Sequence, residues 1–210
     1  MNIYIEIFGV LTGLLYLYFQ IKQRTWMWVL GIVTGLIYAG VFMKKGVYAQ
    51  MLLQVYFVLA GIYGIWRWKY RKGAAQETGI VYRRLTLKLG LMLVAAICVL
   101  SVTVYFALMY LGEGMDSPAE VGASGLTPEQ SAVVFWKRAM DAFTMSASVV
   151  ATLILAYKII EHWLFWIFSD AVLVGLCVLT GLYPSTVLYS CYIALAVVGY
   201  RSWRKNGRQL

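Results

Sequence analysis

The sequence predicts an all-α polytopic membrane protein with seven transmembrane helices, in which two parallel three-helix repeats flank one linker helix. Three observations predict this fold class. Hydrophobic residues make up 62% of the 210 residues and charged residues only 13%, whereas soluble domains contain about 45–50% and about 25%. Seven apolar stretches are long enough to cross a bilayer, which takes about 20 residues per helix. The two ends of the chain also match each other when the sequence is shifted by 135 residues.

The composition excludes other classes of protein. Cys98, Cys177 and Cys191 are odd in number and lie in apolar runs, which excludes a disulfide-bonded secreted scaffold. The high apolar content excludes a disordered chain. Met1–Glu6 contains no basic region, and no small-residue cleavage site follows it. We therefore expect the first apolar stretch to be a membrane span and not a signal peptide.

Continuous apolar runs place the spans along the chain. They are longer and more continuous than the alternating strands of about ten residues in a membrane β-barrel, so each is predicted to be a helix. Gly112–Gln130 contains two prolines, four glycines and four acidic residues and is predicted to be a loop. The seven predicted spans are Ile3–Ile21, Trp26–Met43, Tyr48–Trp66, Leu85–Leu111, Ala132–Tyr157, Trp163–Thr180 and Tyr183–Tyr200.

The basic residues predict the orientation in the membrane. With the N-terminus outside and the C-terminus inside, only Lys44, Lys45, Lys137 and Arg138 of the 18 Lys and Arg residues lie on the outer side. This asymmetry satisfies the positive-inside rule. Because the bases adjoin the span ends and form no separate basic domain, the net charge of +9 does not indicate nucleic-acid binding.

The match between the two ends of the chain is an internal repeat. It carries weight where residues with a distinct steric role coincide, and matched pairs of this kind are Trp28 and Trp163, Gly40 and Gly175, Gly64 and Gly199, and Trp68 and Trp203. The predicted division is 1–70 for the first repeat, 71–131 for the linker helix with its loops, and 132–210 for the second repeat. Since one span separates them, both triplets have the same orientation, an architecture known in transporters. The alternative is a duplication without relevance to transport.

Asp170 is predicted to be the only acidic residue well inside a span. A carboxylate at that depth costs several kcal/mol and indicates function. Trp163 and Trp166 precede it on the same helix face. Two indole rings and a carboxylate would suit a flat cationic ligand. The alternative is a hydrogen bond from Asp170 to a hydroxyl group such as that of Thr34, with the two tryptophans packed against lipid.

The other spans supply further candidates for ligand binding. A glutamine within a span needs a polar partner, and Gln54 lies nearer the membrane centre than Gln50. Gly31 and Gly35 are expected to be sites of helix packing. The predicted substrate-binding residues are Trp28, Thr34, Tyr38, Gln54, Tyr56, Trp163, Trp166, Asp170, Tyr189 and Tyr192.

Several functions lack their sequence motifs. No glycine-rich phosphate loop is present, so this chain is not expected to hydrolyse ATP. The sole histidine, His162, has no partner at metal-binding spacing. No nucleophile and base pair up within the spans. We therefore expect neither an enzyme, nor a metal site, nor a cofactor.

With these residues in view, the sequence resembles the PnuC family of bacterial vitamin transporters over nearly the whole chain except the loop Gly112–Gln130. Two copies of a glycine–aromatic span ending are the most specific shared feature. The motifs that carry the resemblance are Ile5–Gly13, Trp26–Trp28 with Gly31, Tyr48–Met51, Leu53–Tyr56, Ile62–Gly64, Trp66–Trp68, Glu161–Trp163, Trp166, Asp170, Gly181–Tyr183, Gly199–Tyr200 and Trp203. The family often has Asp at the position of Gln50, which leaves the role of Gln50 open.

The resemblance implies a function and an assembly. It implies uptake of nicotinamide riboside by facilitated diffusion across the bacterial inner membrane, with the substrate trapped by phosphorylation in another enzyme. It also implies a fold related to the SWEET sugar transporters and a homotrimer in membrane lipid. Thiamine-transporting PnuT relatives belong to the same family. Pyridinium and thiazolium rings are both flat, aromatic and cationic, so thiamine remains the alternative substrate. A seven-span receptor or membrane scaffold remains the alternative of another class.

Overall fold

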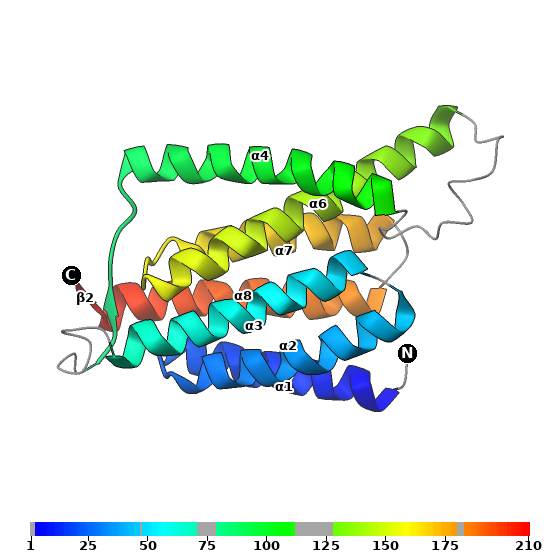
Figure 1. Cartoon of the computed structure of the whole chain (residues 1–210). Coiled ribbons are helices and arrows are strands. Elements are labelled where there is room, and N and C mark those ends of the chain that lie inside the picture. Colours follow the sequence, from blue (N-terminus) through cyan, green and yellow to red (C-terminus); the bar gives the residue numbers. More distant parts are fainter. Residues whose placement is uncertain (1–2, 47, 71–78, 112–127, 180–182) are drawn as a thin grey trace.

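The computed structural model describes residues 3–46, 48–70, 79–111, 128–179 and 183–210. In these residues seven helices run lengthwise beside one another (Figure 1). They are α1 (Ile3–Ile21), α2 (Trp26–Lys45), α3 (Tyr48–Tyr70), α4 (Leu87–Leu111), α6 (Pro128–Ala156), α7 (His162–Leu179) and α8 (Tyr183–Asn206). The described ends of the chain lie at opposite ends of the bundle, as an odd number of crossings requires.

Each predicted span is one of these helices. α2 ends at Gly46, whose φ of 73° is the left-handed conformation that glycine adopts without steric cost. α6 begins at Pro128, inside the segment predicted to be a loop, because proline with its fixed φ is favoured in the first turn of a helix. The rest of that predicted loop, 112–127, lies outside the described residues.

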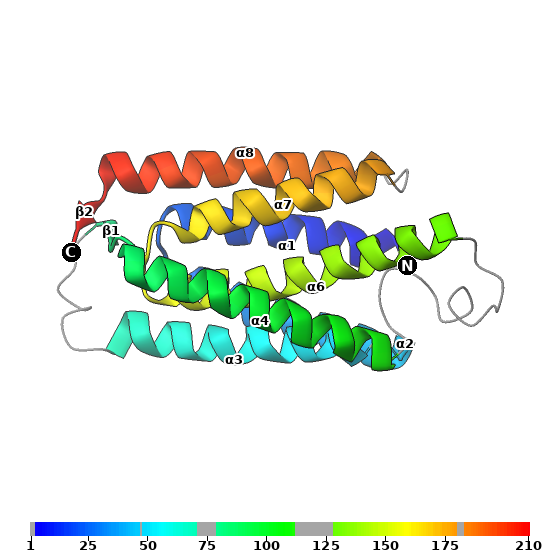
Figure 2. The same cartoon turned by 90° about the horizontal axis from the view of Figure 1, so that it is seen from above.

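The helices have the apolar character of membrane spans. Four of them contain stretches long and apolar enough to cross a bilayer, and α1 and α7 contain shorter apolar stretches. α4 is the most hydropathic and is largely exposed, because it packs mainly against α6 at one side of the bundle (Figure 2). The four long stretches are Trp26–Lys44, Tyr48–Tyr70, Leu87–Tyr110 and Ala132–Ala156.

The all-α prediction needs one correction, because two short strands lie at the C-terminal end of the bundle. β1 (Val81–Tyr82) pairs in parallel with β2 (Arg208–Gln209). The Gln23 side chain also binds Val81, accepting from its N–H at 2.9 Å and donating to its carbonyl oxygen at 2.7 Å. These bonds satisfy backbone groups where the chain leaves the helices. Strands of two residues are too short to produce a sequence pattern.

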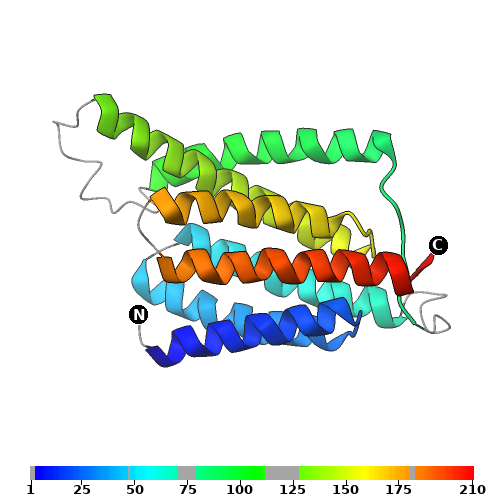
Figure 3. The same cartoon turned by 180° about the vertical axis from the view of Figure 1, so that it is seen from behind.

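The two triplets pack in matching ways. α2 contacts α3 as α7 contacts α8, and α3 contacts α6 as α8 contacts α1 (Figure 3). In the described residues, Gln23 and Lys158 are the two non-glycine positions with positive φ, at 51° and 58°. They lie 135 residues apart, where the chain turns after the first helix of each triplet. The division into residues 1–70, 71–131 and 132–210 remains a prediction.

Four tryptophans fill the C-terminal half of the core in matched pairs. Trp28 packs against Gly64 so closely that a Cβ there would overlap the indole ring, and a Cβ at Gly199 would lie 2.5 Å from Trp163. Trp68 Nε1 donates to the carbonyl oxygen of Ala156 at 3.1 Å. Trp203 Nε1 donates in turn to the carbonyl oxygen of Ile21, also at 3.1 Å. Each triplet therefore donates one indole hydrogen bond to the other.

Candidate functional site

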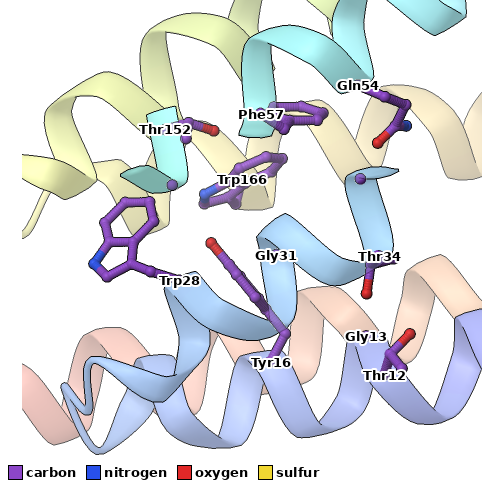
Figure 4. A pocket seen from close by; sticks show the side chains of 12 residues that line it. Thr12, Gly13, Tyr16, Trp28, Gly31, Thr34, Gln54, Phe57, Thr152 and Trp166 are labelled. Carbon is purple, nitrogen blue, oxygen red and sulfur yellow. The ribbon is translucent and has the colours of Figure 1, made fainter. Parts of the chain in front are cut away.

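The first cavity, which we call the threonine cavity, lies between α1, α2, α3, α6 and α7 and has a volume of about 220 Å³. Hydroxyl and amide groups face it from several helices, while Tyr16 extends across it toward Trp166 (Figure 4). Its lining residues are Thr12, Gly13, Tyr16, Trp28, Gly31, Thr34, Gly35, Gln54, Phe57, Gly61, Thr152 and Trp166.

Small residues and internal hydrogen bonds set the chemistry of the threonine cavity. A Cβ at Gly31 would lie 3.3 Å from the Tyr16 ring, so glycine gives that ring its space. Thr12 and Thr152 donate their hydroxyl hydrogens to the carbonyl oxygens of Phe8 and Ser148, both at 2.8 Å. Their oxygens remain acceptors. This half of the site is therefore neutral and suited to ligand hydroxyl groups.

The second cavity, which we call the aspartate cavity, lies between α1, α6, α7 and α8 and has a volume of about 270 Å³. Asp170 of α7 lines it and is 8% exposed. No hydrogen bond or ion pair joins its carboxyl group to another described residue. The cavity is lined by Gly13, Tyr16, Leu17, Gln20, Ser148, Trp166, Ser169, Asp170, Leu173, Tyr189, Tyr192 and Ala196.

The two cavities adjoin and occupy equivalent places in the two triplets. Gly13, Tyr16 and Trp166 line both of them, so one ligand can contact both. The shift of 135 residues places most positions of one lining on the other. The matched positions are Gly13 and Ser148, Gly31 and Trp166, Thr34 and Ser169, Gly35 and Asp170, Gln54 and Tyr189, Phe57 and Tyr192, and Gly61 and Ala196.

A third cavity of about 390 Å³, the side cavity, adjoins the aspartate cavity through the shared residues Ser148, Leu173 and Tyr189. It contains Asp141 of α6, which is 8% exposed. The prediction that Asp170 is the only acidic residue well inside a span is therefore wrong, because α6 buries a second one. The described residues that line the three cavities include two carboxyl groups and no Lys, Arg or His.

The structure brings seven of the ten predicted site residues to these cavities. Trp28, Thr34 and Gln54 line the threonine cavity, and Trp166 lines both that cavity and the aspartate cavity. The predicted residues that line the aspartate cavity are Trp166, Asp170, Tyr189 and Tyr192.

The other three predicted residues are not among those that line the cavities. Trp163 is fully buried against Gly199, so one indole ring, and not two, accompanies Asp170. Tyr56 donates to the carbonyl oxygen of Val149 at 2.7 Å and thereby ties α3 to α6. Tyr38 packs against Phe42, with 6.0 Å between the ring centroids.

Sequence reasoning did not select several lining residues. Tyr16 is central to both cavities, and Gln20 lies deep in the aspartate cavity with an exposure of 1%. A glutamine near the end of an apolar span was the available signal for Gln20, but a span end is also where a polar residue normally reaches water. No cluster of three His, Cys, Asp or Glu residues that could hold a metal ion occurs in the part of the chain that the structure describes.

Comparison with known proteins gives consistent results. The family profile described as nicotinamide mononucleotide transporter matches residues 3–205. The nicotinamide riboside transporter PnuC of Escherichia coli is 29% identical over 215 aligned residues, which cover 98% of this chain and 87% of the relative. The protein of the same name from Neisseria mucosa is 25% identical, and the alignment covers 94% of this chain and 70% of that relative.

A solved structure has the same fold. The crystal structure of the vitamin B3 transporter PnuC superimposes with a TM-score of 0.66 and 21% sequence identity. The superposition covers 97% of this chain and 82% of that chain.

Proposed function

The chain belongs to the nicotinamide mononucleotide transporter family, and on that basis we propose that it carries nicotinamide riboside across the bacterial inner membrane. The observation that carries this proposal is the aspartate cavity, where a buried carboxyl group lies beside Trp166 with no basic residue among the described lining. A buried carboxylate without a cation is costly, and a cationic ring supplies the missing charge. The indole ring adds cation–π attraction.

The same charge distribution favours the riboside over the mononucleotide. A phosphate group is usually bound by Arg or Lys or by a helix N-terminus. The three cavities offer carboxyl groups and no basic side chain among their described residues, so a phosphate would meet repulsion. The names of the curated relatives, nicotinamide riboside transporter, agree with this choice.

Transport is proposed to be facilitated diffusion, with phosphorylation by another enzyme trapping the substrate inside. The sequence has no phosphate loop for ATP. We propose that the chain acts as a carrier and not as an enzyme, and that it forms a homotrimer in the lipid.

The orientation proposed has the N-terminus outside and the C-terminus inside. It rests on the basic residues, most of which then lie on the inner side. In a background without native cysteines, cysteines at Ser117 and Ser202 are expected to be labelled from opposite membrane faces. Labelling of both from one face would contradict the seven-span topology.

Counterflow in proteoliposomes tests the proposed function. Vesicles preloaded with unlabelled nicotinamide riboside should take up external labelled riboside transiently, whereas a receptor or scaffold would bind the label without exchange. Net accumulation in empty, unenergised vesicles is not expected. Parallel titrations of purified protein with nicotinamide riboside and thiamine decide between the two vitamins. Exchange of thiamine alone would replace the substrate while keeping the carrier.

A further inference from the structure

We propose that Gln20 recognises the carboxamide of the ligand's pyridinium ring, so that the aspartate cavity holds the ring and the threonine cavity holds the ribose. This inference rests on the proposed function and deepens it. It defines the substrate class as pyridinium nucleosides that carry a neutral amide. It also assigns a specificity-determining role to a residue of α1, whereas Asp170 and Trp166 belong to α7.

The Gln20 side chain is buried without a partner. The residue is 1% exposed, and its amide nitrogen Nε2 makes no hydrogen bond within the described part of the chain. Buried polar groups are nearly always hydrogen-bonded, because water is lost without replacement when they are not. A buried donor that lines a cavity therefore indicates that a ligand group completes it.

The backbone fixes the position of this amide. The Gln20 carbonyl oxygen accepts hydrogen bonds from Trp203 Nε1 at 3.3 Å and from the Gln23 N–H at 3.0 Å. These contacts hold the end of α1 against α8 and against the following turn. The side chain then lines the aspartate cavity, which Asp170 and Ala196 also line. A preorganised amide of this kind recognises a ligand at little entropic cost.

Amide chemistry matches this placement. A glutamine carboxamide donates through nitrogen and accepts through oxygen, and a ligand carboxamide offers the complementary pair. A ligand carboxylate would only accept, and in the same cavity it would also be repelled by Asp170. The ribose hydroxyl groups would then face the acceptor oxygens of Thr12 and Thr152 in the adjoining cavity.

His162 supplies the competing explanation for Gln20. Its Nδ1 lies 2.6 Å from the carbonyl oxygen of Ile159, so Nε2 is the acceptor of a neutral ring and is itself buried and unpartnered within the described chain. His162 packs against Trp203, whose Nε1 binds Gln20. If Gln20 served only to pair with His162, its loss would affect every ligand alike.

Binding of three ligands to three proteins separates these explanations. The ligands are nicotinamide riboside, the pyridinium riboside without the carboxamide, and nicotinic acid riboside. The proteins are the unaltered chain, Gln20→Leu and the matched control Gln50→Leu, which changes a glutamine of the side cavity. The unaltered chain should prefer nicotinamide riboside to either analogue by about five- to a hundredfold in Kd. Gln20→Leu should abolish the preference over the pyridinium riboside, and Gln50→Leu should keep it.

Each result has a defined meaning. Equal binding of the amide and the amide-free ligand by the unaltered chain would overturn the inference while leaving the transport of pyridinium ribosides intact. A preference that persists in Gln20→Leu would also overturn it, as would equal weakening of all three ligands. Failure of every riboside to bind the folded, unaltered chain would instead contradict the proposed function. Gln20→Met, which keeps the length of the side chain, replaces Gln20→Leu if the latter does not fold.

Discussion

The threonine cavity and the aspartate cavity are equivalent places in two related triplets, yet their side chains differ in size and charge. Where the first triplet has Gly31 and Gly35, the second has Trp166 and Asp170. The large residues of one triplet therefore face space left by the small residues of the other. The comparison teaches that one duplicated framework can provide a neutral half and an acidic half of a single site.

Removing the charge of Asp170 should give the largest change in binding. Asp170→Asn keeps the shape and the hydrogen-bonding capacity of the side chain, so a cationic vitamin should lose roughly 1–3 kcal/mol, about five- to a hundredfold in affinity. A neutral ligand of the same shape should lose much less. Isothermal titration of both ligands measures the difference. Unchanged affinity for the cationic ligand in a folded variant would make the carboxyl group structural.

The matched glycines test whether the two triplets are equally packed. Gly64→Ala and Gly199→Ala should each lower the free energy of unfolding by about 1–3 kcal/mol, because the new methyl group would overlap Trp28 or Trp163. Gly40→Ala and Gly175→Ala, which form another matched pair, are the controls. A Cβ at either control position meets no described atom within 4 Å.

Thermal unfolding in detergent compares these four variants. The two controls should unfold near the temperature of the unaltered protein. If Gly64→Ala and Gly199→Ala were as stable as the controls, the tryptophan–glycine packing would not hold the triplets together.

Trp166 lines both cavities, so its removal should affect both halves of the site. Trp166→Ala should weaken cationic and neutral ligands by about two- to thirtyfold, since stacking area is lost whatever the charge. Trp166→Phe should restore part of the binding because a smaller ring remains. Fluorescence or calorimetric titration measures all three proteins. Loss of the cationic ligand alone would mean that the ring acts only through the charge.

Thr34→Val should give the smallest effect and one confined to the threonine cavity. Loss of one hydroxyl group should weaken nicotinamide riboside by about two- to tenfold. The binding of 1-methylnicotinamide, which carries the cationic ring without ribose, should stay unchanged. Titration of both ligands distinguishes the two halves of the site. Equal weakening of the two would place the ring, and not the ribose, beside Thr34.

The sequence alone predicted the helices well because apolar runs and matched glycines are local signals. Trp28 with Gly64 and Trp163 with Gly199 were visible as a repeat, but the repeat did not show that each tryptophan fills the space above its glycine. Trp163 thus looked like a ligand contact although it is fully buried in the core.

The acidic and amide residues show where sequence reasoning fails. Asp141 was overlooked because the sequence does not show how helices rotate relative to one another, and that rotation decides whether a polar side chain near a span end is buried. Gln20 was overlooked for the same reason. Asp170 was predictable because it lies in the middle of an apolar run, where burial follows from depth.

The crossed indole bonds have a consequence for the evolutionary origin of the protein. Trp68 and Trp203 occupy the same position in their triplets, and so do their acceptors Ala156 and Ile21. An ancestral protein with a single triplet would have formed both bonds with one tryptophan and one carbonyl group, as an isologous two-fold dimer. Fusion through α4, which crosses the membrane once more, would preserve that dimer within one chain. It would also free each former subunit to change its own side of the site.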